Sequence, residues 1–147
     1  MKNQSPQTFR APMPAMYNNS ISLYNLVNKL QSSLLTRATA RKSFIINDID
    51  PTLAVAAEEN ILSYVIGNIL INSVYNSTSS CIRVETVVTE NQLQIRIRNS
   101  CAFVYNNYER ILGEFLEAAD KLGGYIGLEA EQNSGTTVIF SIARQEA

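Results

Sequence analysis

The chain has 147 residues, a length that suits one domain with a single hydrophobic core. Its formal net charge is −1, and basic and acidic residues are interspersed, which argues against a surface for nucleic acid or anionic membrane. The sequence has no histidine, which excludes an imidazole metal site, a nucleophile activated by histidine and a phospho-accepting histidine within this chain.

The first segment, residues 1–19, contains three prolines and no hydrophobic periodicity, so we expect a flexible N-terminal arm. Residues 20–147 are then expected to form the domain. A helix is predicted from an N-cap at Ser20 or Ser22 to about Arg41. Its apolar residues recur on one face, which we expect to pack on a sheet rather than form a dimer seam. They are Leu23, Leu26, Val27, Leu30, Leu34 and Ala38.

Two extended segments and a long helix come next. The segment from Ser43 to Asp50 is rich in branched and aromatic residues and predicts a strand, which Pro51 ends. A brief extended piece is expected at residues 52–57. From Glu58 to Ser77, apolar residues recur three and four positions apart, which predicts an amphipathic helix at the centre of the fold. They are Ile61, Leu62, Val65, Ile66, Ile69, Leu70 and Val74.

The segments 81–89 and 92–100 alternate between apolar and polar residues, with two residues between them, which predicts a β-hairpin. A two-residue turn places Val84 opposite Ile97 on the inner face and Glu85 opposite Arg96 on the outer face. On this register Asn99 lies on the inner face at the strand end, close to the central helix.

The last part of the chain predicts a helix and a second hairpin. After an irregular stretch at residues 101–107, apolar periodicity predicts a helix from Tyr108 to Leu122, which Gly123 and Gly124 end. The segments 125–131 and 136–143 predict the closing hairpin. This order of elements favours a two-layer α/β sandwich, in which a mixed, mostly antiparallel sheet carries helices on one face.

A stripe of asparagines runs beside the apolar face of the central helix. Asn68, Asn72 and Asn76 follow Tyr64 at intervals of four residues. One interpretation is that these amides satisfy nearby backbone groups, because half-buried amides need hydrogen-bond partners. The other is that they bind a ligand.

Three segments resemble the GHKL superfamily, the histidine-kinase-like ATPase domains of sensor histidine kinases. Residues 65–73, VIGNILINS, resemble its N-box, with Ser73 in place of alanine. Residues 122–126, LGGYI, resemble the Gly-Gly stretch before its last hairpin. Residues 134–140, SGTTVIF, resemble its closing Gly-x-Thr strand. The resemblance covers most of the chain after the arm and implies the same fold.

The resemblance also implies a nucleotide pocket, and this sequence departs from the family's pattern at several positions of that pocket. Asn72 matches the asparagine that holds magnesium, supported by Asn68 and Thr137. Asn99 stands where the family has the aspartate that binds adenine, and a charge-assisted hydrogen bond is thereby lost. The two glycines that follow that aspartate are replaced, and the phosphate-binding glycine motif falls on residues 109–113, ERILG, which contain one glycine. A remnant pocket of Asn68, Asn72, Asn99 and Thr137, without catalytic residues, is therefore expected.

Three functions follow as alternatives. The first is a degenerate ATPase domain that has weak or no ATP binding and serves as a protein-interaction or regulatory module in bacterial two-component signalling. Its partner would be a response regulator, a phosphotransfer protein or a kinase, and no cofactor is expected. The second is a small Mg-ATP-binding protein, either a sensor-kinase catalytic domain or an anti-sigma-type serine kinase, in which Asn72 would hold magnesium. The third is an unrelated α/β sandwich with an unidentified ligand.

Other sequence features bear on the cellular location, the state of the cysteines and the oligomeric state. No apolar run is long enough to cross a bilayer and no signal peptide is recognisable, so a cytoplasmic location is expected. Cys81 and Cys101 fall on opposite faces of the hairpin, which predicts free thiols rather than a disulfide. A homodimer through the arm or the outer sheet face is left open, with Val87 as a weak apolar signal on that face.

Overall fold

The computed structural model describes residues 20–100, 113, 115–131 and 135–144. The predicted arm, the irregular stretch 101–107 with Cys101, and the first part of the helix predicted from Tyr108 lie outside these residues. The turn residues 132–134 lie outside them as well. Within the described residues, no helix is long and apolar enough to cross a membrane.

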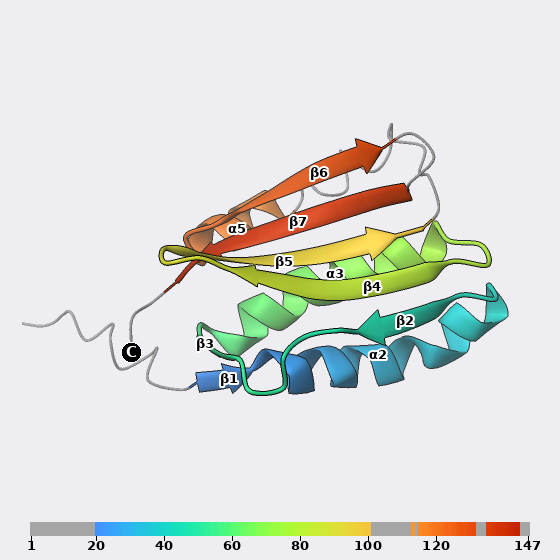
Figure 1. The fold of residues 1–147 in the computed structure, drawn as a ribbon, viewed down its shortest axis with the longest axis horizontal. Coiled ribbons are helices and arrows are strands. Elements are labelled where there is room, and N and C mark those ends of the chain that lie inside the picture. The colour runs from blue at the N-terminus through green and yellow to red at the C-terminus, as the bar shows by residue number, and fades with distance from the viewer. Residues whose placement is uncertain (1–19, 101–112, 114, 132–134, 145–147) are drawn as a thin grey trace, which may run out of the picture.

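A five-stranded mixed sheet carries helices on one face (Figure 1). The strand order is β2-β4-β5-β7-β6, in which β2 pairs parallel with β4 and all other neighbours are antiparallel. The strands are β2 (Phe44–Asn47), β4 (Cys81–Val88), β5 (Gln92–Asn99), β6 (Tyr125–Glu131) and β7 (Gly135–Ala143). The helices are α2 (Leu23–Ala40), α3 (Glu59–Tyr75) and α5 (Leu116–Lys121). This confirms the predicted sandwich.

A second, two-stranded sheet lies beside the first helix. In it, β1 (Ser20–Ser22) pairs antiparallel with β3 (Ala54–Ala56), and Ser20 lies opposite Ala56. Of the two predicted N-caps, Ser22 is correct, because its Oγ accepts a hydrogen bond from Asn25 N at 3.2 Å. Ser20 instead belongs to the short strand.

The strand predicted from Ser43 to Asp50 is shorter in the structure. Asn47 is its last residue, and the Asn47 side chain accepts a hydrogen bond from Ile49 N at 3.3 Å, which turns the chain out of the sheet. The Asn47 amide also donates to Tyr24 O and Asn28 Oδ1 at 3.0 and 2.9 Å. These contacts fix the end of the edge strand β2 to α2.

The core lies between the sheet and the helices. The predicted hairpin register is confirmed, with Val84 opposite Ile97 and Glu85 opposite Arg96. Phe140 of β7 is fully buried beside Ile95. The predicted apolar face of α3 is also buried, apart from Ile61, which is half-buried. The helix that precedes the last hairpin ends as predicted, since Gly123 has φ +70°.

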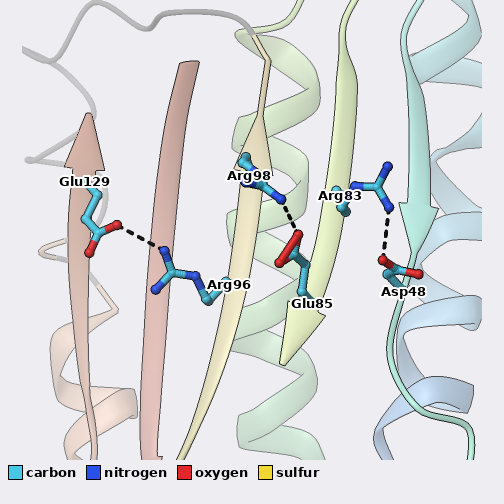
Figure 2. Close-up of polar contacts among 6 residues, drawn as sticks. All are labelled: Asp48, Arg83, Glu85, Arg96, Arg98 and Glu129. Atoms are coloured by element: carbon cyan, nitrogen blue, oxygen red, sulfur yellow. Dashed lines mark hydrogen bonds and ion pairs between the residues drawn. The ribbon is translucent and has the colours of Figure 1, made fainter. Parts of the chain in front are cut away.

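The outer face of the sheet carries paired charges (Figure 2). Arg83 contacts Asp48 and Arg96 contacts Glu129, each at 3.0 Å, and Arg98 contacts Glu85. Glu85 therefore bonds the diagonal arginine rather than Arg96, which lies directly across from it. Because each carboxylate faces an arginine, these six side chains carry no net charge.

Candidate functional site

A buried polar cluster joins the central helix to the end of the sheet. We name it the Asn99 cluster and define it as Ser73 of α3, Asn99 of β5 and Thr136 of β7. Their side chains are 1%, 0% and 1% exposed. Asn99 and Thr136 are direct cross-strand partners, so both face the helix layer. Asn99 Nδ2 donates to the backbone oxygen of Ser73 at 3.0 Å.

The Asn99 amide is a structural contact in this arrangement. A buried backbone carbonyl needs a donor, and an amide supplies one whereas an ionised carboxylate does not. An aspartate at this position would place a buried negative charge against the Ser73 carbonyl. The local packing therefore accounts for an asparagine, rather than an aspartate, at position 99.

Close backbone approach at the cluster explains the glycine of the closing strand. Gly135 has φ +91°, and a Cβ built on it would lie 2.0 Å from Asn99 O. Any other residue would push β7 away from the end of β5.

The Ser73 hydroxyl differs from the rest of the cluster. Its Oγ is buried and has no hydrogen-bond partner among the described residues. A buried hydroxyl without a partner costs roughly 1–3 kcal/mol of stability. The structure therefore carries an unfavourable polar atom at Ser73, the position that the sequence resemblance matches to an alanine.

The asparagine stripe divides into two kinds of side chain. Asn68 Nδ2 donates to Tyr64 O at 2.7 Å, and Asn76 Nδ2 donates to Asn72 O at 2.8 Å. These two amides satisfy the backbone of their own helix, as one of the two interpretations predicted. Asn72 is half-buried, and its side chain makes no hydrogen bond to the described residues. Asn72 is thus the member of the stripe whose amide is available to a ligand.

Thr137 does not join the other predicted site residues. It lies opposite Arg98 and Glu129, on the outer face of the sheet, away from α3. The inward residue is its neighbour Thr136, which sequence reasoning missed. Strand alternation could have identified it, because Val138 and Phe140 face the core and residues two positions apart share a face.

Metal binding has little support from the described side chains. Within those residues, no group of three or more cysteine, aspartate or glutamate side chains is placed to hold a metal ion. Cys81 is a free thiol, as predicted.

Solved structures of histidine kinases resemble this chain. The nucleotide-free catalytic domain of histidine kinase ThkA is 17% identical, with 86% of this chain and 95% of that chain covered and a TM-score of 0.71. Histidine kinase AdeS of Acinetobacter baumannii is 14% identical, with 87% and 68% covered and a TM-score of 0.76.

Two of the similar structures contain a further molecule. ThkA in complex with the response regulator protein TrrA is 17% identical, with 86% of this chain and 42% of that chain covered and a TM-score of 0.72. Full-length ShkA in complex with AMPPNP is 16% identical, with 88% and 32% covered and a TM-score of 0.74. This chain spans less than half the length of either protein.

These likenesses establish the fold. The chain has the histidine-kinase-like GHKL fold, as the three motifs implied, so a sandwich of a different fold, the third alternative, is excluded. No protein-family model and no curated protein matches the sequence.

Proposed function

We propose that this chain is a histidine-kinase-like ATPase domain in which ATP binding is weak or lost, and that it acts as a protein-interaction or regulatory module in bacterial two-component signalling. The observation that carries the proposal is the Asn99 contact. Asn99, which the resemblance matches to the adenine-binding position, is fully buried and donates its amide proton to the central helix. An amide that already donates to the backbone of the central helix stabilises the fold and is not available to a ligand.

The partner would be a response regulator, a phosphotransfer protein or a kinase in the cytoplasm. The complex of ThkA with TrrA supports a response regulator, because that kinase has the same fold. Since this chain has no histidine, it cannot supply the phospho-accepting histidine itself. The phospho-accepting histidine would therefore lie outside these 147 residues.

A second candidate function rests on Asn72. Its half-buried amide, which makes no hydrogen bond to the described residues, would hold a magnesium ion next to a nucleotide. The ShkA complex contains the ATP analogue AMPPNP. On this alternative the chain is a small Mg-ATP-binding protein, either a sensor-kinase catalytic domain or an anti-sigma-type serine kinase.

Titration calorimetry with Mg-ATP and Mg-ADP separates the two candidates. We expect no saturable heat from the wild-type chain up to a nucleotide concentration of about 1 mM. A wild-type Kd of about 10–100 µM that Asn72→Asp abolishes and Asn76→Asp preserves would refute the proposal. Asn76→Asp is the matched control, because it makes the same chemical change one turn along the helix at an exposed amide.

Restoring the aspartate tests the Asn99 contact itself. We expect Asn99→Asp to lower the free energy of unfolding, because the donor is lost and a charge is buried, and to create no ATP binding. If Asn99→Asp instead keeps wild-type stability and binds Mg-ATP, then the adenine pocket is intact apart from one atom, and the structural role assigned to Asn99 is wrong.

The interaction role has its own test. The full chain, immobilised and incubated with cell extract, should retain proteins with a receiver or phosphotransfer domain, equally with and without Mg-ATP. Retention that requires ATP would favour the second candidate. Absence of any such protein among the captured ones would contradict the assignment to two-component signalling.

A further inference from the structure

A large cavity lies at the end of the sandwich opposite the Asn99 cluster. It has a volume of about 690 Å³ and lies between β3, the turn that joins β4 to β5, and the end of β7. Its buried apolar wall is formed by Val55, Leu93 and Ile142. Val88, 42% exposed, lies on the rim. In Figure 1 these elements gather on the left, whereas β5 ends on the right.

A smaller cavity continues this one toward the end of α5. Its volume is about 120 Å³, and it shares Ala56, Ile142 and Ala143 with the large cavity. The shared residues place the two cavities side by side, and we call the pair the groove. Two adjacent cavities suit an extended peptide segment better than a compact small molecule.

The chain itself leads to this groove. Residues 1–19 precede Ser20, the first residue of β1, and Ser20 pairs with Ala56. Ala56 lines both cavities. Antiparallel cross-strand partners have Cα atoms about 4.5–5.5 Å apart. The N-terminal segment is therefore attached one strand away from the groove, well within the reach of a few residues.

The composition of residues 1–19 matches the groove. Besides Met1, the segment carries four large apolar side chains, and proline stands on each side of Met13. Methionine side chains adapt to irregular cavities. Proline restricts its own backbone and that of the residue before it to extended conformations, which lowers the entropy lost on binding. The four apolar residues are Phe9, Met13, Met16 and Tyr17.

We infer that residues 1–19 bind back on their own domain, with Met13 or Met16 inserted into the cavity lined by Val88 and Leu93. Attachment at Ser20 gives the segment an effective concentration of about 1 mM at the groove. An intrinsic Kd of about 0.1 mM would then leave the groove occupied in roughly nine molecules of ten. A second copy of the chain or a separate protein would lack this advantage.

Methyl NMR on the full chain tests the contact directly. We expect nuclear Overhauser effects from the Met13 or Met16 methyl group to Val88 and Leu93. They should disappear in Val88→Glu and remain in Val87→Glu. These two valines are adjacent and equally exposed, at 42% and 44%, but only Val88 lines the cavity. If Val88→Glu fails to fold, Ala54→Glu on the opposite wall replaces it.

Thermal unfolding of full-length variants supplies an independent readout. The double variant Met13→Asp/Met16→Asp should lower Tm by about 4 °C in the wild-type and Val87→Glu backgrounds and by less than about 1 °C with Val88→Glu. The control, Asn3→Asp/Gln7→Asp, adds the same charge away from Met13 and Met16 and should leave Tm unchanged.

Two results would overturn the inference. One is the absence of both the methyl contacts and the Tm difference between cavity and control variants. The other is methyl contacts between differently labelled chains, with a Tm that rises with protein concentration, because the occupant would then be a second copy.

Discussion

Replacing Ser73 by alanine should stabilise the protein. The Ser73 hydroxyl is 1% exposed and has no hydrogen-bond partner among the described residues. Its removal relieves the desolvation cost of an unpaired hydroxyl, roughly 1–3 kcal/mol, and replaces serine by the best helix former in a helix interior, worth a few tenths of a kcal/mol more. The small void left by one oxygen offsets part of the gain. We expect a net increase of about 1–2 kcal/mol in the free energy of unfolding.

Ser77→Ala is the matched control because it makes the same chemical change a few residues away. Ser77 is 0% exposed, and its Oγ lies 2.7 Å from Val74 O and 2.8 Å from Ser43 Oγ. Removing this hydroxyl breaks two hydrogen bonds, so we expect a loss of about 1–2 kcal/mol. The two serine substitutions should therefore change stability in opposite directions.

Urea unfolding followed by circular dichroism, with thermal scans, measures both variants. For a domain of this size, 1 kcal/mol corresponds to a shift in Tm of about 3–5 °C. A Ser73→Ala variant that loses 1 kcal/mol or more would refute the reasoning, because it would mean that the hydroxyl has a partner. Equal effects of Ser73→Ala and Ser77→Ala would refute it as well.

Three further substitutions test contacts elsewhere in the fold. Gly124→Ala should cost at least about 3 kcal/mol or prevent folding, because its Cβ would lie 1.7 Å from Ser141 O. In an expression and thermal-shift comparison, Gly113→Ala should be neutral or stabilising, because no atom of the described residues beyond its own helix lies within 4 Å of the added Cβ. Asn47→Ala should cost about 1–3 kcal/mol in urea unfolding, since its side chain makes three hydrogen bonds that hold β2 to α2, and a smaller loss would mean that solvent replaces them. Glu85→Gln should cost less than about 1 kcal/mol, and nothing measurable in 1 M salt, because its ion pair is partly exposed; a larger, salt-independent loss would contradict this.

The hairpin register was predictable because two constraints agree. A two-residue turn allows one register between β4 and β5. In that register, the alternation of apolar residues turns the apolar side chains of both strands toward the core. Asn99 was therefore assigned to the inner strand end beside the central helix, and the structure confirms that position. The donor role of its amide was not predictable, since it depends on the distance between two elements far apart in sequence.

Other features carried weaker signals. The pairing of β1 with β3 joins two strands of three residues each, which is too short for alternation to be recognised. Because that pairing positions β3, the groove beside β3 could not be predicted from the sequence. The assignment of Thr137 to the pocket came from the Gly-x-Thr resemblance alone, and strand alternation, which favours Thr136, would have been the better guide.

A binding site and a stable fold make opposite demands on the same polar groups. A nucleotide site must keep donors and acceptors unpaired until the ligand arrives, which costs stability in the empty protein. At the Asn99 cluster the Asn99 donor is already paired with the helix, and removing the unpaired Ser73 hydroxyl is expected to raise stability. Asn72 is the remaining side chain of the predicted pocket whose amide has no partner in the part of the chain that the structure describes. If the proposed function is right, Asn72→Ala should change neither stability nor partner binding by more than about 0.5 kcal/mol, because a half-buried amide without a partner contributes little to either. A large loss of partner binding in this variant would show that the central helix is itself the interaction surface.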